Sequence, residues 1–500
     1  MKTKKDSKKT KPATNDLGPK RSQADNIVEL LNESFYFDFF LDQGEDLYVS
    51  IWHEEEGYTE VRRCDTVEFK AMISKMYWDQ HEKTPQIGAI RDALGVLHGT
   101  ALYDGEKADL ENRMRHAEDC LWYDLTTPNW DVVRIKEESW EVTKNHKPIF
   151  RREIHNKPQS APEKGGDINK FLDFVNIADA QDELLLLVYL VTCFVPDFPH
   201  PMAYFYGPQG SAKSTMSRLL RSLIDPSRID VSQIPDSERE LDQLFEHHRF
   251  IAFDNVSFLG DKLSDTLCKA ITGVSSSKRK LYTNDEYQIY SYQRCIVMNG
   301  INLLALKPDL LERSLLFELD RVDKTKRVYE SDLWKRFEIE KPKLLGAIFT
   351  IISKAMRIKE HVDLPERPRM ADFALWGYAI AEAMGRDGDD FICSYKNNLK
   401  KQTMEVLYEH PTASAVLVFM RGKERWEGTA SSLLTELHFV ADKESTHRKL
   451  PESANALSRS LAQVRTSLEE GGIRFSRQDG KERSIILEYL DPEKIENTDK

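Results

Sequence analysis

The stretch of the sequence whose residue types are best suited to chemistry is YFYGPQGSAKST, residues 204–215. An apolar run stops at Gly207, a loop of small residues follows, and Lys213 and Ser214 come next. Where a strand leads into such a loop and a helix leaves it, backbone N–H groups and the positive end of the helix dipole favour a phosphate group. Lys213 would then reach the β- and γ-phosphates of a nucleotide, and the Ser214 hydroxyl would ligate Mg²⁺.

This loop fits the phosphate-binding pattern GxxxxGK[ST] with one departure, because Ala212 stands where the second glycine belongs. Alanine is the smallest side chain that can replace glycine there. The alternative interpretation is a turn rich in glycine and serine that happens to contain a lysine. We expect ATP and Mg²⁺ as cofactors, with the nucleotide bound by Gly207, Pro208, Gln209, Gly210, Ser211, Ala212, Lys213, Ser214 and Thr215.

Three later residues follow or precede short apolar runs. Asp254 ends the run FIAFD, where a second carboxylate would support Mg²⁺, usually through water. Asn299 ends CIVMN, where an amide can orient a water molecule and sense the γ-phosphate. Arg313 comes just before SLLFEL, and in a ring of subunits it would stabilise charge at the neighbour's γ-phosphate. The alternative for Arg313 is a surface salt bridge.

The elements that must position these residues are short buried strands alternating with helices. Apolar runs at 203–206, 250–253, 295–298 and 315–319 have the length of strands in a parallel sheet. Helical stretches lie between them, so the fold class is α/β with a P-loop core. The predicted domains are a basic disordered tail (1–22), an α+β accessory domain (23–165), the ATPase core (166–330), a helical lid or linker (331–410), a winged-helix domain (411–490) and a tail (491–500).

Within the accessory domain, residues 67–80 and 85–102 are expected to be helices. Alternating apolar and polar residues between 120 and 143 predict antiparallel strands, whose Trp and Tyr side chains we assign to the core rather than to base stacking. The Pro/Gly/Lys-rich segment 155–167 predicts the boundary to the core.

The last predicted domain reads as a helix, a strand, two helices and a hairpin. Leu457, Leu461, Val464 and Leu468 share one face of the third helix, and Arg459 and Gln463 lie opposite, where a recognition helix faces a DNA groove. The hairpin turn Asp479-Gly480 is flanked by basic residues that could contact phosphates, among them Arg474, Arg477 and Lys481. The alternative is a winged helix that contacts protein.

The overall composition limits the class of protein. The chain has 500 residues, with 71 basic and 83 acidic side chains and a net charge of −12, so any nucleic-acid site must be a local patch. Its six cysteines show no CxxC spacing, which indicates neither a zinc site nor a disulfide framework. The longest apolar run, 184–195, is too short to span a bilayer and predicts a buried helix. We therefore expect a cytoplasmic protein with no membrane partner.

The order and spacing of GPQGSAKST, FIAFDN, CIVMNGI and LLERSLLFEL resemble the AAA+ ATPases of superfamily 3 helicase type, especially the primase-helicase-like ATPases of phages, plasmids and integrated elements. The resemblance implies an ATP-driven machine on DNA that forms a homo-oligomer, a hexameric ring. It assigns Asn299 as the first sensor and Arg313 as the finger acting in trans. Arg294 resembles a second basic residue that faces phosphate across the interface.

Two departures from that family weaken the comparison. Asn255 stands after Asp254 where a second acid is usual, and an amide positions water but cannot take its proton. Either Asp254 serves both roles or an acid comes from elsewhere, such as PDSERELD at 235–242, and slow hydrolysis would then be no surprise. The hairpin before the sensor strand has the tip TNDE, which repels phosphate, where the family usually has Lys or His. Lys278, Arg279 and Lys280 at the base of its first strand are either DNA contacts or a solvated charge run.

The resulting hypothesis is an ATP-dependent DNA helicase or translocase that replicates a mobile element, with a primase or another replication protein as a possible partner. The alternative is a non-helicase AAA+ switch that assembles on DNA for initiator loading, regulation or defence. Asn255 and the acidic hairpin tip favour the alternative somewhat. A metabolite kinase fits less well, because no arginine-rich lid follows the P-loop.

Overall fold

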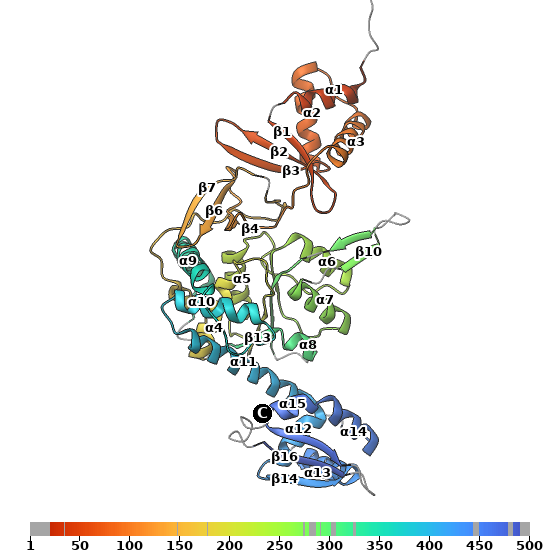
Figure 1. Cartoon of the computed structure of the whole chain (residues 1–500), viewed down its shortest axis with the longest axis vertical. Coiled ribbons are helices and arrows are strands. Elements are labelled where there is room, and N and C mark those ends of the chain that lie inside the picture. The colour runs from red at the N-terminus through yellow and green to blue at the C-terminus, as the bar shows by residue number, and fades with distance from the viewer. Residues whose placement is uncertain are drawn as a thin grey trace, which may run out of the picture. The chain divides into compact units, whose positions relative to one another are not determined.

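The computed structural model describes the chain apart from residues 1–20, 35, 148, 178, 274–275, 280–286, 291, 302–306, 324–326, 444–449, 479–483 and 491–500. Lys280, Lys481, the hairpin tip and most of both predicted tails therefore lie outside the described residues. Contacts divide the chain into two units. The first comprises residues 1–110 with 145–151, and the second comprises 111–144 with 152–500 (Figure 1).

The first unit packs three helices against a three-stranded antiparallel sheet in the order β1-β2-β3. Its core includes Ile27, Val49, Phe69 and Leu97, all at most 2% exposed. The predicted helices at 67–80 and 85–102 are confirmed. The elements are α1 (Gln23–Asn32), β1 (Phe37–Leu41), β2 (Leu47–His53), β3 (Tyr58–Arg63), α2 (Val67–His81) and α3 (Ile87–Tyr103).

The second unit begins with a four-stranded antiparallel sheet, ordered β4-β5-β6-β7. The strands predicted between 120 and 143 are confirmed, and Tyr123, Trp130 and Trp140 are buried, as expected for core residues. The contacts place this sheet with the following core, so the division falls after residue 110 rather than at the predicted 165. The strands are β4 (Met114–Ala117), β5 (Cys120–Asp124), β6 (Asp131–Lys136) and β7 (Ser139–Lys144).

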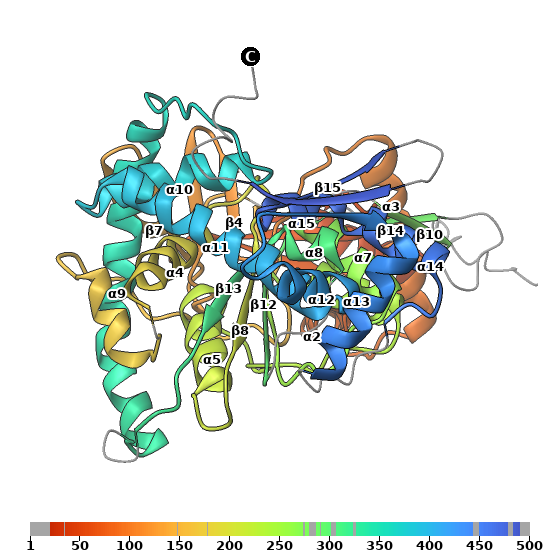
Figure 2. The same ribbon diagram turned by 90° about the horizontal axis from the view of Figure 1, so that it is seen from below.

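The centre of the second unit is a parallel sheet in the order β13-β8-β12-β9, and Figure 2 shows β13, β8 and β12 side by side. All four predicted parallel strands are confirmed as β8 (Met202–Tyr206), β9 (Phe250–Phe253), β12 (Cys295–Gly300) and β13 (Ser314–Glu318). Because the strands are parallel, their carboxyl ends meet at one edge. The helices around them are η1 (Ile168–Phe174), α4 (Ala180–Thr192), α5 (Lys213–Ile224), α6 (Glu238–His247), α7 (Asp261–Thr272) and α8 (Pro308–Leu311).

Long helices follow the sheet, as predicted for 331–410: α9 (Glu330–Lys359), α10 (Ala371–Ala383) and α11 (Gly388–Glu409). The segment before η1 lies tightly on α9. A Cβ on Gly346 would come within 1.7 Å of the Glu163 carbonyl oxygen, so glycine is required at this crossing. The apolar run at 184–195 is the buried helix α4, as predicted. Among the described residues, no helix is long and apolar enough to cross a membrane.

A two-stranded hairpin, β10 (Ser276–Arg279) and β11 (Tyr287–Tyr290), precedes β12. Lys278 and Arg279 are the last two residues of β10, pairing with Gln288 and Tyr287, so they lie at its tip end and not at its base as the sequence suggested.

The last part of the chain has its own hydrophobic core around a three-stranded sheet ordered β14-β16-β15. Leu457, Leu461, Val464 and Leu468 are buried in it, as predicted. The single third helix of the prediction is two helices, because α14 ends at Gln463. The elements are α12 (Pro411–Met420), β14 (Arg425–Thr429), α13 (Ala430–Lys443), α14 (Ala454–Gln463), α15 (Arg465–Glu470), β15 (Ile473–Gln478) and β16 (Ser484–Tyr489).

Candidate nucleotide-binding site

The loop between β8 and α5 turns in the way that its small residues allow. Gly207 has a φ of 142°, and a Cβ there would lie 2.2 Å from the Leu319 carbonyl oxygen. Gly210 has a φ of 80°. Ala212, where the sequence pattern expects glycine, has a φ of 65° and ψ of 24°. This left-handed conformation costs an alanine ~1 kcal/mol or more, which explains why glycine is the usual residue at this position.

Lys213 is the first residue of α5, and its side chain folds back over the loop. The Nζ donates to the carbonyl oxygens of Gly207 at 2.7 Å and Pro208 at 2.9 Å, and to the Ser211 hydroxyl at 3.2 Å. Burial lowers the pKa of Lys213, and the nearby Asp254 carboxylate works in the opposite direction. The ammonium group of Lys213 therefore bonds only to neutral acceptors of the loop. A phosphate group would be a stronger acceptor, because it is charged.

Three predicted residues meet beside Lys213 at the carboxyl edge of the sheet. The Ser214 hydroxyl donates to Asp254 Oδ1 at 2.6 Å. Asn299 Nδ2 donates to the same oxygen at 2.8 Å. These contacts join α5, β9 and β12 in one cluster, which comes from three separate parts of the sequence. A hydroxyl and a carboxylate so close are oxygen donors of the kind that Mg²⁺ prefers, so the residues present fit a magnesium nucleotide.

Asn299 is held rigidly in this cluster. Its side chain is only 2% exposed, and Nδ2 also donates to the Ser217 hydroxyl at 3.1 Å, while Oδ1 accepts the Asn255 backbone N–H at 2.9 Å. The amide therefore fixes the orientation of the Asp254 carboxylate and of the following backbone. Sequence reasoning missed Ser217, whose only signal is its position one turn after Lys213.

Asn255 adopts a left-handed backbone with a φ of 52°, which asparagine tolerates better than most residues. Its side chain is exposed beside Asp254. That Asn255 positions a water molecule stays a prediction. Among the described residues, no group of three or more His, Cys, Asp or Glu side chains could hold a metal ion.

A segment that the sequence analysis did not single out lies against the loop. After β13, Val322 N donates to the Gly210 carbonyl oxygen at 3.2 Å. Farther along, Arg327 Nη2 lies 3.5 Å from the position that a Cβ on Gly210 would occupy. Arg218 of α5 then pairs with Glu330, the first residue of α9, at 2.8 Å. Arg327 has no ion pair among the described residues, and no motif in the sequence marks it.

Arg313 lies at the opposite edge of the sheet from the loop, since it immediately precedes the first residue of β13. Its side chain is 15% exposed, and Nη1 pairs with Asp309 at 2.5 Å. Asp309 also pairs with Arg369. The hydrogen bond from Arg313 is the main reason that the pKa of Asp309 is lowered to about 2, and Arg369 lowers it further. Arg313 is therefore near the surface and engaged by its own subunit.

Arg294 is in a less suitable place for its predicted role across an interface. Its side chain is buried, with the residue 5% exposed, and the guanidinium donates to the carbonyl oxygens of Phe245 and Gln293. It precedes β12, so it also lies at the edge away from the P-loop. Its burial argues against a direct contact with a neighbouring subunit's nucleotide.

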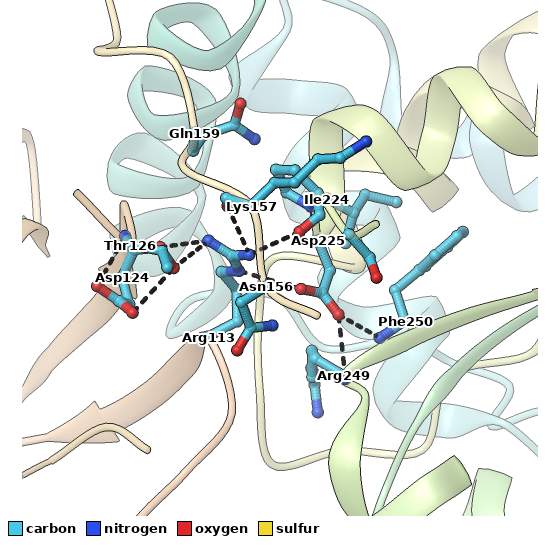
Figure 3. A network of polar contacts seen from close by, with 12 residues as sticks. Arg113, Asp124, Thr126, Asn156, Lys157, Gln159, Ile224, Asp225, Arg249 and Phe250 are labelled. Atoms are coloured by element: carbon cyan, nitrogen blue, oxygen red, sulfur yellow. Dashed lines mark hydrogen bonds and ion pairs between the residues drawn. The ribbon is translucent and has the colours of Figure 1, made fainter. Parts of the chain in front are cut away.

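The far end of α5 is held by a buried polar network, shown in Figure 3. Asp225, 1% exposed, accepts from Arg113 Nε at 3.0 Å and from the backbone N–H groups of Arg249 and Phe250 at 3.2 and 3.3 Å. Burial alone would raise the pKa of Asp225, but the guanidinium groups of Arg221 and Arg113 outweigh burial and hold it well below its usual value. One carboxylate thus ties α5 to both β9 and the residue before β4.

The last carbonyl groups of α5 are capped by side chains from residues before 166. Gln159 Nε2 donates to the Leu223 oxygen at 2.7 Å, and the Tyr123 hydroxyl donates to the Ile224 oxygen at 3.2 Å. Arg113 Nη2 donates to the Pro226 oxygen at 2.9 Å. These caps explain why residues 111–144 and 152–165 belong with the core: they satisfy helix-end acceptors that would otherwise be buried without partners.

The residues predicted to contact DNA near the C-terminus are exposed, including Arg459, Gln463, Arg474 and Arg477. The structure brings α14 and β15 together, because the Arg477 guanidinium donates to the Ser458 carbonyl oxygen next to Arg459. A patch of two arginines from separate elements is therefore on one surface. Whether it binds DNA stays a prediction.

Comparison with known families adds an independent observation. Residues 168–403 match the family model described as the actinomycete integrative conjugative element replication protein, and residues 412–497 match the model of the C-terminal domain of that protein. Over these two regions the chain is similar to a mobile-element replication protein. The first match contains the whole of the candidate site, and the second corresponds to the part with its own core around β14–β16.

No curated protein matches this sequence. Among solved structures, the A form apo structure of the NrS-1 C terminal region is 12% identical, with a TM-score of 0.43, and 93% of this chain and 98% of that chain are covered. A second apo structure of the same region, 305–718, is 11% identical with a TM-score of 0.42, covering 94% and 100% of the two chains. Likeness at this level carries no argument about function.

Proposed function

We propose that this replication protein is an ATPase of AAA+ superfamily 3 type that acts on DNA as a helicase or translocase. The observation that carries the proposal is the meeting of Lys213, Ser214, Asp254 and Asn299 at the carboxyl edge of a parallel sheet. Lys213 and the backbone of the loop would hold the phosphates. Mg²⁺, when bound to the Ser214 hydroxyl and Asp254, would neutralise charge on the β- and γ-phosphates.

The remaining roles follow from the same geometry. Asn299 would keep Asp254 in position, since its amide bonds the carboxylate directly. Arg327 would add a positive charge on the open side of the loop, beside Gly210. The part of the chain around α14 and β15 would contact DNA as a winged helix, through Arg459 and Arg477.

The alternative is a non-helicase AAA+ switch on DNA. It is favoured by Asn255, because the position beside Asp254 carries no second carboxylate to accept a proton from water. In that case ATP binding would drive assembly, and slow hydrolysis would reset it.

The experiment is ATP hydrolysis by the full chain with and without forked DNA, for wild type and Lys213→Ala. The variant should lose at least about a hundredfold in hydrolysis, because it removes the only lysine on the loop. Lys75→Ala, on the exposed face of α2, is the matched control and should behave as wild type. Equal hydrolysis by wild type and Lys213→Ala would refute the proposal. DNA-stimulated hydrolysis without strand separation would favour the switch.

A further inference from the structure

The first unit contains an apolar groove between α2 and α3. Its volume is about 690 Å³, within the range of ligand-binding clefts. Leu47, Ala71, Ile90 and Leu94 are among the residues that line it. The groove belongs to neither the candidate nucleotide site nor the DNA-binding patch proposed above, and neither family match reaches this unit.

The rim of the groove exposes large apolar side chains to water. Val67 at the start of α2 is 78% exposed, and Ile87 at the start of α3 is 86% exposed. Both line the groove. Apolar side chains left in water around an apolar hollow mark an interaction surface, since isolated ones are common but a contiguous set is not.

A glycine within α3 adds a second observation. Gly95 lines the groove, and a Cβ built there would meet no atom within 4 Å. Glycine inside a helix costs ~1 kcal/mol relative to alanine, and no described atom uses the space above it. Such a glycine suits the close approach of another backbone.

The charged side chains of the first unit indicate which kind of molecule the groove would bind. The part of the first unit that the structure describes, within residues 21–110 and 145–151, carries 19 acidic and 10 basic side chains, an excess of negative charge. Three carboxylates, Glu45, Asp46 and Asp65, line the groove itself, against two basic side chains, Lys70 and Arg91. A nucleic acid would be repelled, and so would a second copy of this acidic unit.

The chain's own basic tail is a poorer occupant than a partner protein. Residues 1–20 contain seven lysines but only Met1 and Leu17 as large apolar side chains, too few to fill an apolar groove. An amphipathic helix supplies apolar anchors one turn apart and charges beside them, which is how helix-in-groove recognition works.

We propose that the groove between α2 and α3 binds an amphipathic helix of a partner protein, with its apolar stripe in the groove and flanking lysine or arginine residues facing the acidic surface. The proposal does not depend on the nucleotide site. It assigns to the first unit the task of recruiting a basic partner to the replication protein.

The test uses three synthetic fluorescent peptides and the full chain. The first carries leucine at i, i+3, i+4 and i+7 with lysine on the other face, the second replaces each lysine by glutamate, and the third scrambles the first. Fluorescence anisotropy should show at least about tenfold tighter binding of the first peptide than of the other two. Equal binding of the scrambled peptide would overturn the proposal, because it would show attraction by charge alone.

Two substitutions locate the binding. Val67→Glu and Ile87→Glu change exposed rim residues, so the unit should fold, as circular dichroism would verify, and each should weaken the first peptide at least about tenfold. Tyr103→Glu is the matched control, since Tyr103 is 84% exposed and does not line the groove. Unchanged affinity in both rim variants would overturn the proposal.

Two other possible occupants of the groove, the chain's own N-terminal tail and a second copy of the chain, would give different results in these experiments. Removing residues 1–20 should leave the peptide affinity unchanged, and a rise would show that the tail fills the groove. The rim variants should keep the oligomeric mass of the wild type, and a fall in mass would show that a second copy fills it. Either result would contradict a separate partner.

Discussion

Ala212 occupies a backbone conformation that its side chain disfavours, at the point where the loop after β8 enters α5. The sequence pattern alone showed only that a glycine is missing. The φ of 65° shows why glycine is usual there and what alanine costs. Contacts around the turn include Val322 N on the Gly210 carbonyl oxygen and Lys213 Nζ on the carbonyl oxygens of Gly207 and Pro208.

Ala212→Gly should therefore leave the protein as stable or make it more stable. The substitution relieves a left-handed alanine, which should stabilise the fold by ~1–2 kcal/mol. It also gives the unfolded chain more conformational freedom, which should destabilise the fold by ~0.4–1 kcal/mol. Thermal unfolding measures the result. Ala462→Gly, at an exposed position inside α14, is the matched control and should lower stability by ~1 kcal/mol. A clear loss of stability in Ala212→Gly would contradict the proposed source of strain.

Arg327 is the residue that the sequence did not reveal at this site. If it binds phosphate, Arg327→Ala should weaken nucleotide binding by about 10- to 100-fold, the value of a charge-assisted hydrogen bond of ~1.5–3 kcal/mol. Titration of a fluorescent ATP analogue measures the change. Arg321→Ala, an exposed arginine of the same segment, should bind as wild type. Equal weakening by both variants would point to a general loss of positive charge instead.

At the scale of elements, α5 is held at both ends. Its first turn carries Lys213 and Ser214, and its last carbonyls are capped from β5 and from the segment around Gln159. The network of Figure 3 holds the end of α5 that lies away from Lys213. The two histidines beside this network, His155 and His248, make that anchor sensitive to acid.

Burial lowers the pKa of His248 to about 3, with a further contribution from the Arg221 guanidinium that donates to its Nδ1. The unfolded chain binds this proton near pH 6.5, and the folded chain does not, so stability is complete above pH 6.5 and falls as the pH drops toward 3. The slope should reach ~1.4 kcal/mol per pH unit from this group. Urea unfolding between pH 4.5 and 7.5 measures it.

His248→Gln is the variant that isolates this effect. It should reduce the pH dependence of the unfolding free energy below pH 6.5, even though it weakens the contact with Arg221 at every pH. An unchanged slope in His248→Gln would show that other groups, such as His155 or Asp225, dominate the acid response.

At the scale of the whole molecule, the open question is whether neighbouring subunits share a site. Arg313 lies at the sheet edge away from the loop between β8 and α5, so in the proposed ATPase it would act on a nucleotide only in trans. To do so it must leave Asp309, which its guanidinium now engages. Assembly would therefore exchange an ion pair within one subunit for a contact with the next.

Mixing two inactive variants tests this arrangement. Lys213→Ala and Arg313→Ala chains should each be inactive alone. An equal mixture should recover activity at about a quarter of its interfaces, because those combine the intact lysine of one chain with the intact arginine of another. Mass photometry checks that both variants assemble as wild type does. No recovery in mixed oligomers would contradict a shared site.

The sequence determined the local features of this protein. Periodicity and residue type predicted the four strands of the parallel sheet, the helices α2, α3 and α4, and the residues Lys213, Ser214, Asp254 and Asn299. The strand and helix predictions are confirmed, because a buried strand and a long helix each depend on neighbouring residues. The roles of Lys213, Ser214, Asp254 and Asn299 stay predictions. The parallel order then forces the ends of β8, β9 and β12 to one edge.

Tertiary structure alone decided how distant segments complete the site. Arg327 lies near the loop, Gln159 caps α5, Arg113 pairs with Asp225 just after α5, and Arg294 is buried. None of these has a local signal, because each depends on packing between residues far apart in the chain. For the same reason the boundary falls after residue 110 and not in the Pro/Gly-rich segment, whose backbone is fixed by contacts that composition cannot show.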